Sequence, residues 1–131
     1  MDQTNYAYSV KTSLKFGEAV SKVTDELKKG GFGILTEIDV KDTFKRKIDL
    51  DFRRYRILGA CNPHLASKAL QQELEIGLLL PCNVIIYEND DRTATVSFLS
   101  PKAQFKATGR DDMGPLVDEA EGLIKKIAEQ I

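Results

Sequence analysis

Residues 51–88 constrain the fold more than any other part of the chain. Two uninterrupted apolar runs, residues 57–61 and 76–82, lie on either side of Asn62-Pro63. An Asn side chain accepts hydrogen bonds from the free N–H groups of a helix start, and proline suits the first helical position. The stretch is therefore predicted to form a buried strand, a helix, a tight apolar turn and a second buried strand.

Apolar periodicity elsewhere in the chain predicts the remaining elements. Alternation of apolar and polar residues is typical of half-buried strands, here at residues 6–11, 32–38 and 93–99. Spacing of three and four residues is typical of amphipathic helices, here at residues 16–27, 40–48 and 116–131. Together with the central stretch, these elements give the order β-α-β-α-β-α-β-β-α.

Residues 89–92, Asn-Asp-Asp-Arg, have the composition of a four-residue hairpin loop between two strands. A hairpin joins antiparallel strands, so a fully parallel, doubly wound sheet is excluded. We predict an α+β fold with a two-layer sandwich, in which a mixed sheet of about five strands carries helices mainly on one face. Residues 1–131 are predicted to form a single domain, since domains cluster near ~100–150 residues.

Helix ends are also marked in the sequence. Thr12 or Ser13 is expected to cap the first helix, and Asp39 the second. The GGFG motif at residues 30–33 is reminiscent of a phosphate-binding loop, but such a loop needs glycines between a strand and the start of a helix. Here the glycines follow a helix and lead into a strand, so they are predicted to end the helix.

The balance of charge argues against two classes of partner. Basic residues number 19 and acidic residues 20, which gives a net charge of −1 and no global attraction to nucleic acid or to an anionic membrane. No apolar run approaches the ~18 residues of a membrane span, and the polar first residues lack a secretion pattern. With only two cysteines there is no disulfide scaffold, and we expect a cytoplasmic protein.

Three blocks of sequence resemble a known family. These are GFGILTEIDV at residues 31–40, GACNPHLASKAL at residues 59–70 and LLLPCNV at residues 78–84. They are similar to domain of unknown function 302, a family of small bacterial and archaeal proteins, and the resemblance runs from about Tyr6 to the final helix. It implies a compact α+β domain that is dimeric, and it implies no particular activity.

The residues with the most versatile chemistry gather in the central stretch. Cys61, His64 and Cys82 offer two thiols and an imidazole, ligands that zinc, copper(I) or iron would accept. The two thiols alone could serve a redox switch. The helix that begins at Asn62 is expected to lower the pKa of the Cys61 thiol. Alternatively, both cysteines are small buried side chains with no chemical role.

Three functional hypotheses follow from these residues. The first is a small binding or sensing domain that holds a metal ion, a redox signal or a small ligand near Cys61, Asn62 and Cys82. The second is a purely structural homodimeric interaction module. The third is an enzyme in which Cys61 is the nucleophile and Arg56 binds an anionic substrate. No dinucleotide fingerprint, nucleophile elbow or zinc-protease motif is present to identify a cofactor or a reaction.

Strand direction decides how far apart the two thiols lie. If the strands ending at Cys61 and beginning at Cys82 are antiparallel neighbours, the two thiols lie near each other at one end of the sheet, with His64 on the rim. If the strands are parallel, the thiols lie at opposite ends.

A homodimer is also expected, because Ile85 and Tyr87 would otherwise be uncovered apolar residues on the face of the sheet without helices.

Overall fold

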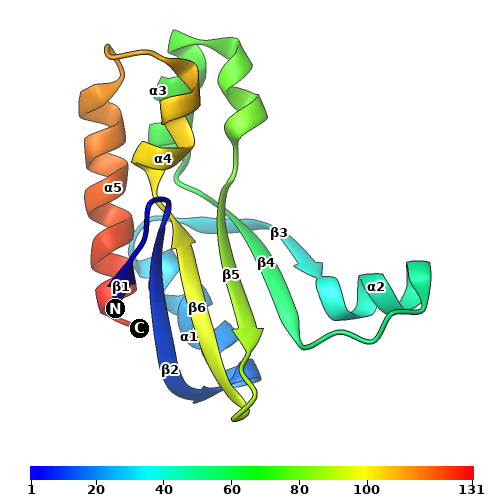
Figure 1. Cartoon of the computed structure of the whole chain (residues 1–131). Helices are drawn as coiled ribbons and strands as arrows, with labels where there is room; N and C mark the ends of the chain where they lie inside the picture. Colours follow the sequence, from blue (N-terminus) through cyan, green and yellow to red (C-terminus); the bar gives the residue numbers. More distant parts are fainter.

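A curled sheet of six strands lies at the centre of the computed structural model, which describes residues 1–131 (Figure 1). The strands in chain order are β1 (Asp2–Gln3), β2 (Ala7–Lys15), β3 (Gly33–Asp39), β4 (Tyr55–Cys61), β5 (Cys82–Glu88) and β6 (Thr93–Leu99). They are arranged in the order β1-β2-β6-β5-β4-β3, and every neighbouring pair is antiparallel. β5 therefore lies inside the sheet, as its two apolar faces predict.

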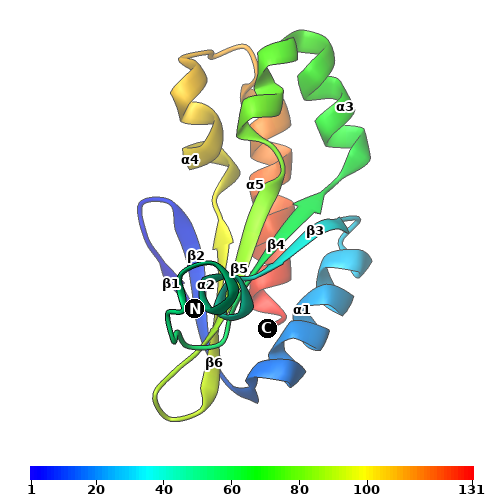
Figure 2. The same cartoon turned by 90° about the vertical axis from the view of Figure 1, so that its right-hand side faces the viewer.

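Helices occupy most of the connections between these strands. The α-helices are α1 (Phe16–Lys29), α2 (Val40–Ile48), α3 (Pro63–Gln72), α4 (Pro101–Phe105) and α5 (Gly114–Glu129), and the 3₁₀ helices are η1 (Leu74–Leu79) and η2 (Lys106–Thr108). Figure 2 shows α3 and α4 beyond one end of the sheet, with α5 running alongside both the sheet and these helices. None of the helices is both long enough and apolar enough to cross a membrane.

Side-chain caps and a glycine fix the predicted helix boundaries. The Asp39 carboxylate accepts a hydrogen bond from the N–H of Asp42 at 3.0 Å, at the start of α2. The Asn62 side-chain oxygen accepts one from the N–H of Leu65 at 3.2 Å, at the start of α3. Gly31 follows α1 with φ +86°, a conformation that few residues other than glycine adopt. Both caps and the helix-ending role of the glycines are confirmed.

The buried face of the sheet forms the main core with α1 and α5. Tyr8, Phe98, Val84 and Leu58 lie opposite one another across β2, β6, β5 and β4, and all four are buried. Apolar side chains from one stripe of α1 and from α5 pack on this row in the same core cluster. We call this side of the sheet the covered face.

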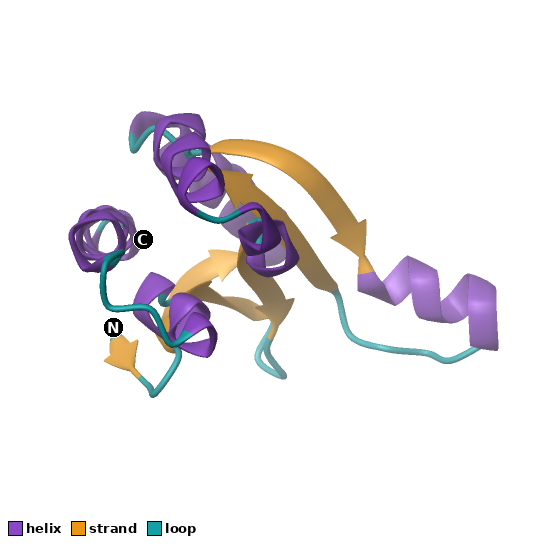
Figure 3. Ribbon diagram, turned by 90° about the horizontal axis from the view of Figure 1, so that it is seen from above, coloured by secondary structure: helices purple, strands orange, loops and turns teal.

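The opposite side of the same strands has no such helical layer, and we call it the open face. Ser9, Ser97, Ile85 and Ile57 form the neighbouring row across the same four strands. Both isoleucines are only half-buried. In Figure 3, which looks down on the molecule, α2 and α5 lie on opposite sides of the sheet.

The sheet differs from the prediction in its strand number and strand directions. It has six strands rather than about five, because Asp2–Gln3 folds back on β2 as β1, a pairing too short to show in the periodicity. It is antiparallel throughout rather than mixed. The connections that contain α2 and α3 return to an adjacent antiparallel strand, although the α3 connection is long enough for a parallel crossover.

The first helix begins later than predicted. Neither Thr12 nor Ser13 is its cap, because β2 continues to Lys15 and α1 begins at Phe16. The Thr12 hydroxyl instead donates a hydrogen bond to the Ala94 carbonyl of β6 at 2.7 Å. This pairing with β6 keeps the chain extended past the point at which the local cap pattern predicted a helix.

Candidate functional site: a pocket with two thiols

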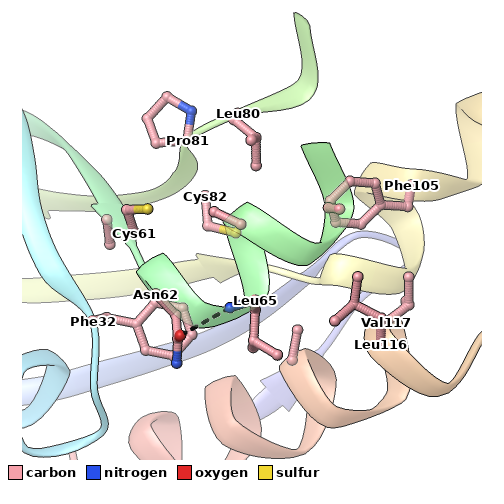
Figure 4. Close-up of a pocket in the computed structure, with 14 residues that line it drawn as sticks. Phe32, Cys61, Asn62, Leu65, Leu80, Pro81, Cys82, Phe105, Leu116 and Val117 are labelled. Carbon is pink, nitrogen blue, oxygen red and sulfur yellow. Dashed lines mark hydrogen bonds between the residues drawn. The ribbon is translucent and has the colours of Figure 1, made fainter. Parts of the chain in front are cut away.

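Both cysteines line a pocket at the end of the sheet where β4 stops and β5 starts (Figure 4). Helices α3 and α5 enclose it, and Phe105 at the end of α4 closes one side. We call it the thiol pocket. Its internal volume is about 40 Å³, room for roughly three water molecules.

Strand pairing explains why the two cysteines meet here. β4 and β5 are antiparallel, and Ala60 lies directly opposite Cys82. Cys61 follows Ala60, so both thiols lie at the same end of the sheet, which agrees with the antiparallel alternative. The two thiols are free and do not form a disulfide.

The lining of the pocket is almost wholly apolar. None of its fourteen residues carries a charge, and Asn62 is the only one with an amide side chain. The oxygen of that amide already accepts the hydrogen bond from Leu65 that caps α3 (Figure 4). The pocket can therefore accept apolar groups. An ion that entered it would lose its hydration shell without gaining a polar or charged partner.

Cys82 is held in place by a buried glutamine. Its Sγ donates a hydrogen bond to Oε1 of Gln104 at 3.2 Å, and the Gln104 amide nitrogen donates to the Leu79 carbonyl. Burial raises the pKa of the Cys82 thiol to about 11, although the bond to Gln104 acts in the opposite direction. Cys82 is therefore protonated at neutral pH.

Burial also raises the pKa of the Cys61 thiol, so the prediction that the start of α3 would lower it is wrong. Removing the thiol from water disfavours its charged form. The helix start offers little compensation, because Pro63 has no N–H and the N–H of Leu65 is bonded to Asn62. A protonated thiol is a poor nucleophile and a poor metal ligand.

His64 does not join the cysteines. It lies on α3 as an exposed residue and does not line the thiol pocket. No three His, Cys, Asp or Glu side chains of the chain form a group that could hold a metal ion. The predicted metal site of Cys61, Cys82 and His64 therefore has no ligand cluster in this structure.

Arg56 is also separate from the thiols. It precedes Cys61 by five positions on β4, roughly 16 Å along an extended strand. Its guanidinium contacts the carboxylates of Glu37 at 2.7 Å and Asp39 at 4.0 Å, and lies 5.7 Å from the ring centroid of Phe16. The structure therefore does not bring Arg56 to the Cys61 thiol, because Arg56 lies beside these carboxylates at the other end of β4 and does not line the thiol pocket.

Gln104 and Phe105 were missed because the periodicity of the sequence predicts no helix or strand between residues 99 and 116. The structure places α4 there. Ser100-Pro101 repeats the pattern of Asn62-Pro63, a capping side chain followed by proline, and the Ser100 hydroxyl accepts a hydrogen bond from Ala103 N at 3.4 Å. That pattern predicts a helix start and could have identified this wall of the pocket.

Comparison with known proteins now identifies the family. The family model described as "Domain of unknown function DUF302" matches residues 8–131. The chain belongs to the DUF302 family. A crystal structure of an uncharacterized conserved DUF302 protein from Bacillus stearothermophilus has the same fold, with a TM-score of 0.88 and 24% sequence identity, over 97% of this chain and 98% of that chain. No curated protein matches the chain.

Proposed function

We propose that this DUF302 protein binds a small, uncharged and largely apolar molecule in the thiol pocket. The observation that carries the proposal is a pocket already formed between the sheet and the helices, lined by apolar side chains and two protonated thiols. Ligand sites in proteins are typically apolar concavities with a few polar groups that fix orientation. Asn62 and the thiols are those groups here.

The size of the pocket limits the ligand. A volume of about 40 Å³ suits a molecule of a few non-hydrogen atoms, or the apolar end of a longer molecule that leaves through the open side. Small ligands gain at most ~1.5 kcal/mol per non-hydrogen atom. At that limit a ligand of about four such atoms gains ~6 kcal/mol, so its Kd is expected to be no tighter than about 40 μM.

A thiol-redox or nucleophilic role has less support. Disulfide exchange and nucleophilic attack both proceed through the thiolate. The raised pKa values of Cys61 and Cys82 keep the thiolate fraction small at neutral pH. In the purely structural alternative, the two cysteines only fill space between the sheet and α3, and no small molecule binds.

Titration of the isotope-labelled protein with xenon and a series of short aliphatic alcohols tests this proposal. Amide resonances at Cys61, Leu65 and Cys82 should shift saturably. Ala66→Leu places a larger side chain in the lining and should weaken binding at least about tenfold, the loss of ~1.4 kcal/mol. Ser67→Leu adds the same side chain at the neighbouring, exposed position of α3 and should leave binding unchanged.

Two outcomes would reject ligand binding in this pocket. One is the absence of saturable shifts with every member of the series, which would leave the structural role. The other is equal binding by wild type and Ala66→Leu, which would place the apolar molecules elsewhere. Rapid reaction of Cys61 with a thiol reagent at neutral pH would instead favour the redox or nucleophilic role.

A further inference from the structure

A cleft rich in positive charge lies at the end of the sheet opposite the thiol pocket, between the start of β4 and the loop that joins β5 to β6 (Figure 1). We call it the basic cleft. Its volume is about 390 Å³, and none of the seven residues that line it is apolar. The cations among them are Lys41, Arg53, Arg54 and Arg92. The whole chain has a net charge of −1, so this concentration of positive charge is local.

Three separate segments of the chain are held together around the basic cleft. The N–H of Glu88 donates a hydrogen bond to the Arg54 carbonyl at 2.9 Å, and the Arg53 guanidinium donates one to the Glu88 carbonyl at 3.1 Å. At the start of α2, the Lys41 ammonium donates to the Phe52 carbonyl at 3.0 Å. These bonds position the cations before any ligand arrives.

Three of the four cations have no acidic partner. Lys41, Arg54 and Arg92 are exposed and form no salt bridge, whereas Arg53 lies 3.7 Å from Asp90. The acidic residues that line the basic cleft are Glu88 and Asp90. Four positive and two negative side chains leave a surplus of two positive charges, which an anion with two negative charges would balance.

The requirements of the β5–β6 loop do not explain the arginine at position 92. Arg92 has φ +71°, a conformation in which glycine or asparagine is less strained. None of the side-chain hydrogen bonds or salt bridges formed by arginines of the chain involves Arg92. Its guanidinium therefore adds no polar contact to the fold and is available to a ligand.

A groove adjoins the basic cleft on the side of α1. It shares Lys41 and Arg54 with the cleft, and its volume is about 440 Å³. The apolar residues that line it are Phe16, Val20 and Tyr55. Arg56 also lines the groove, but its guanidinium is paired with Glu37 at 2.7 Å. An anionic group therefore fits the cleft, and an organic group attached to it fits the groove, with Arg54 between them.

We propose that the basic cleft and the groove bind a small organic phosphate. Its phosphate group lies among Lys41, Arg54 and Arg92, and its organic part lies against Phe16 and Tyr55. A guanidinium can hold a phosphate through two parallel hydrogen bonds, and a lysine adds a point charge. A phosphate monoester has nearly two negative charges at neutral pH, which matches the surplus of the cleft. This site is separate from the thiol pocket and does not depend on the apolar ligand proposed there.

The distribution of charge favours a small molecule over a polymer or a membrane. Nucleic acids and anionic membranes contact many cations over an extended surface. On α2, beyond the cleft, Lys45 pairs with Asp49 at 2.8 Å and Arg46 pairs with Asp42 at 2.8 Å. The free cations that face the cleft therefore form a compact group of three.

Titration of the isotope-labelled full chain with phenyl phosphate, inorganic phosphate and benzoate at constant ionic strength tests the proposal. Phenyl phosphate should shift the amide resonances of Gly17, Arg54 and Arg92 saturably and should bind more tightly than the other two anions. Arg54→Gln removes the cation shared by cleft and groove and should weaken binding of phenyl phosphate at least about tenfold. Arg92→Gly removes a second guanidinium, suits the backbone at φ +71° and should weaken binding in the same way.

Two control variants separate a specific site from other causes. Lys47→Gln removes the same charge from an exposed position of α2 that lines neither the cleft nor the groove, and it should bind phenyl phosphate like wild type. Ala66→Leu in the thiol pocket should also leave this binding unchanged. Arg54→Gln and Arg92→Gly should keep the circular dichroism and thermal unfolding of wild type, because neither guanidinium forms a salt bridge with the rest of the chain.

Four results would overturn the proposal. The first is the absence of saturable shifts with either phosphate. The second is equal weakening by Lys47→Gln and Arg54→Gln, which would mean that net charge alone attracts the anion. The third is benzoate binding as tightly as phenyl phosphate. The fourth is tighter binding of a single-stranded oligonucleotide or of anionic lipid vesicles through the same arginines, which would make the cleft part of a surface for polyanions.

Discussion

Ile85 and Ile86 are consecutive residues of β5 with the same side chain, yet Ile86 is fully buried and Ile85 is only half-buried. Successive residues of a strand point to opposite sides of the sheet. Ile86 faces α1 and α5 on the covered face, while Ile85 faces outward beside Ile57. Hydrophobicity alone does not decide the burial of these residues, because α1 and α5 of the same chain pack over Ile86, whereas no such helical layer covers Ile85.

Replacing Ile85 and Ile86 by alanine, one at a time, should give the largest difference in the free energy of unfolding between the two faces. Ile86→Ala removes fully buried methyl groups and should lower the free energy of unfolding by ~2–5 kcal/mol. Ile85→Ala should cost less than about half of that, since its side chain is already partly hydrated. Urea denaturation of the dilute protein measures both values, and equal losses would mean that the side chain of Ile85 is covered as fully as that of Ile86.

A substitution at Gly59 tests how closely β3 and Pro81 pack over β4 near the thiol pocket. A Cβ at this position would lie 2.7 Å from Cγ of Pro81 and would also clash with the Thr36 side chain. Gly59→Ala should therefore cost ~1–3 kcal/mol through overpacking. Gly33→Ala on neighbouring β3 meets no atom within 4 Å and is the control. Similar stabilities for the two variants would show that β3 and Pro81 do not pack closely over β4.

Glu121 is a buried carboxylate on the side of the sheet that α5 covers. Burial raises the pKa of the Glu121 carboxyl, but hydrogen bonds from the Tyr8 hydroxyl, the Lys102 N–H and the Ser100 hydroxyl outweigh it and hold the pKa below its ordinary value. Because the folded pKa is lowered, this contribution to stability is present above about pH 4.5 and is lost as the pH falls through the folded pKa.

Glu121→Gln should lower the free energy of unfolding by ~1–3 kcal/mol at neutral pH, because it removes the charged acceptor of these bonds. It should also flatten the fall in stability as the pH drops below about 4.5. Glu119→Gln, at an exposed position of the same helix, is the control. Thermal unfolding across this pH range measures the effect, and an unchanged acid profile in Glu121→Gln would contradict it.

The smallest expected effect is on the outward side of α5. Gly122 is exposed in the middle of this helix, and an added Cβ would meet no atom within 4 Å. Gly122→Ala should raise the free energy of unfolding by ~0.5–1 kcal/mol, because alanine favours a helix interior. A loss of stability in chemical denaturation would show that this side of α5 contacts something, such as another chain.

Features with a local cause were predictable from the sequence. Asp39 and Asn62 cap their helices by bonds to residues three positions ahead. The hairpin between Glu88 and Thr93 likewise depends on the four residues in its loop. These interactions are complete within a few residues, so composition and spacing contain the information needed.

Features that depend on distant partners were not predictable in the same way. Thr12 resembled a helix cap, but its hydroxyl bonds to Ala94, 82 positions away. The apolar pattern around Cys61 and Cys82 was compatible with parallel or antiparallel strands. The bonds that hold Cys82 depend on Gln104 of α4 meeting the carbonyl of Leu79, and the burial that raises the cysteine pKa values arises only in the folded chain.

Helix α5 joins two cores of very different size. Its C-terminal half contributes to the sixteen-residue cluster on the sheet, while Leu116 and Val117 pack against a cluster of only three buried residues, Ala69, Ile76 and Met113. Local unfolding begins where few apolar contacts must be broken. We therefore expect amides of α3 and of the first turns of α5 to exchange with solvent by partial opening, while those of β5 and β6 exchange only on global unfolding. The thiol pocket lies on the boundary between these two units, so its walls come from both the slowly and the rapidly exchanging parts of the chain.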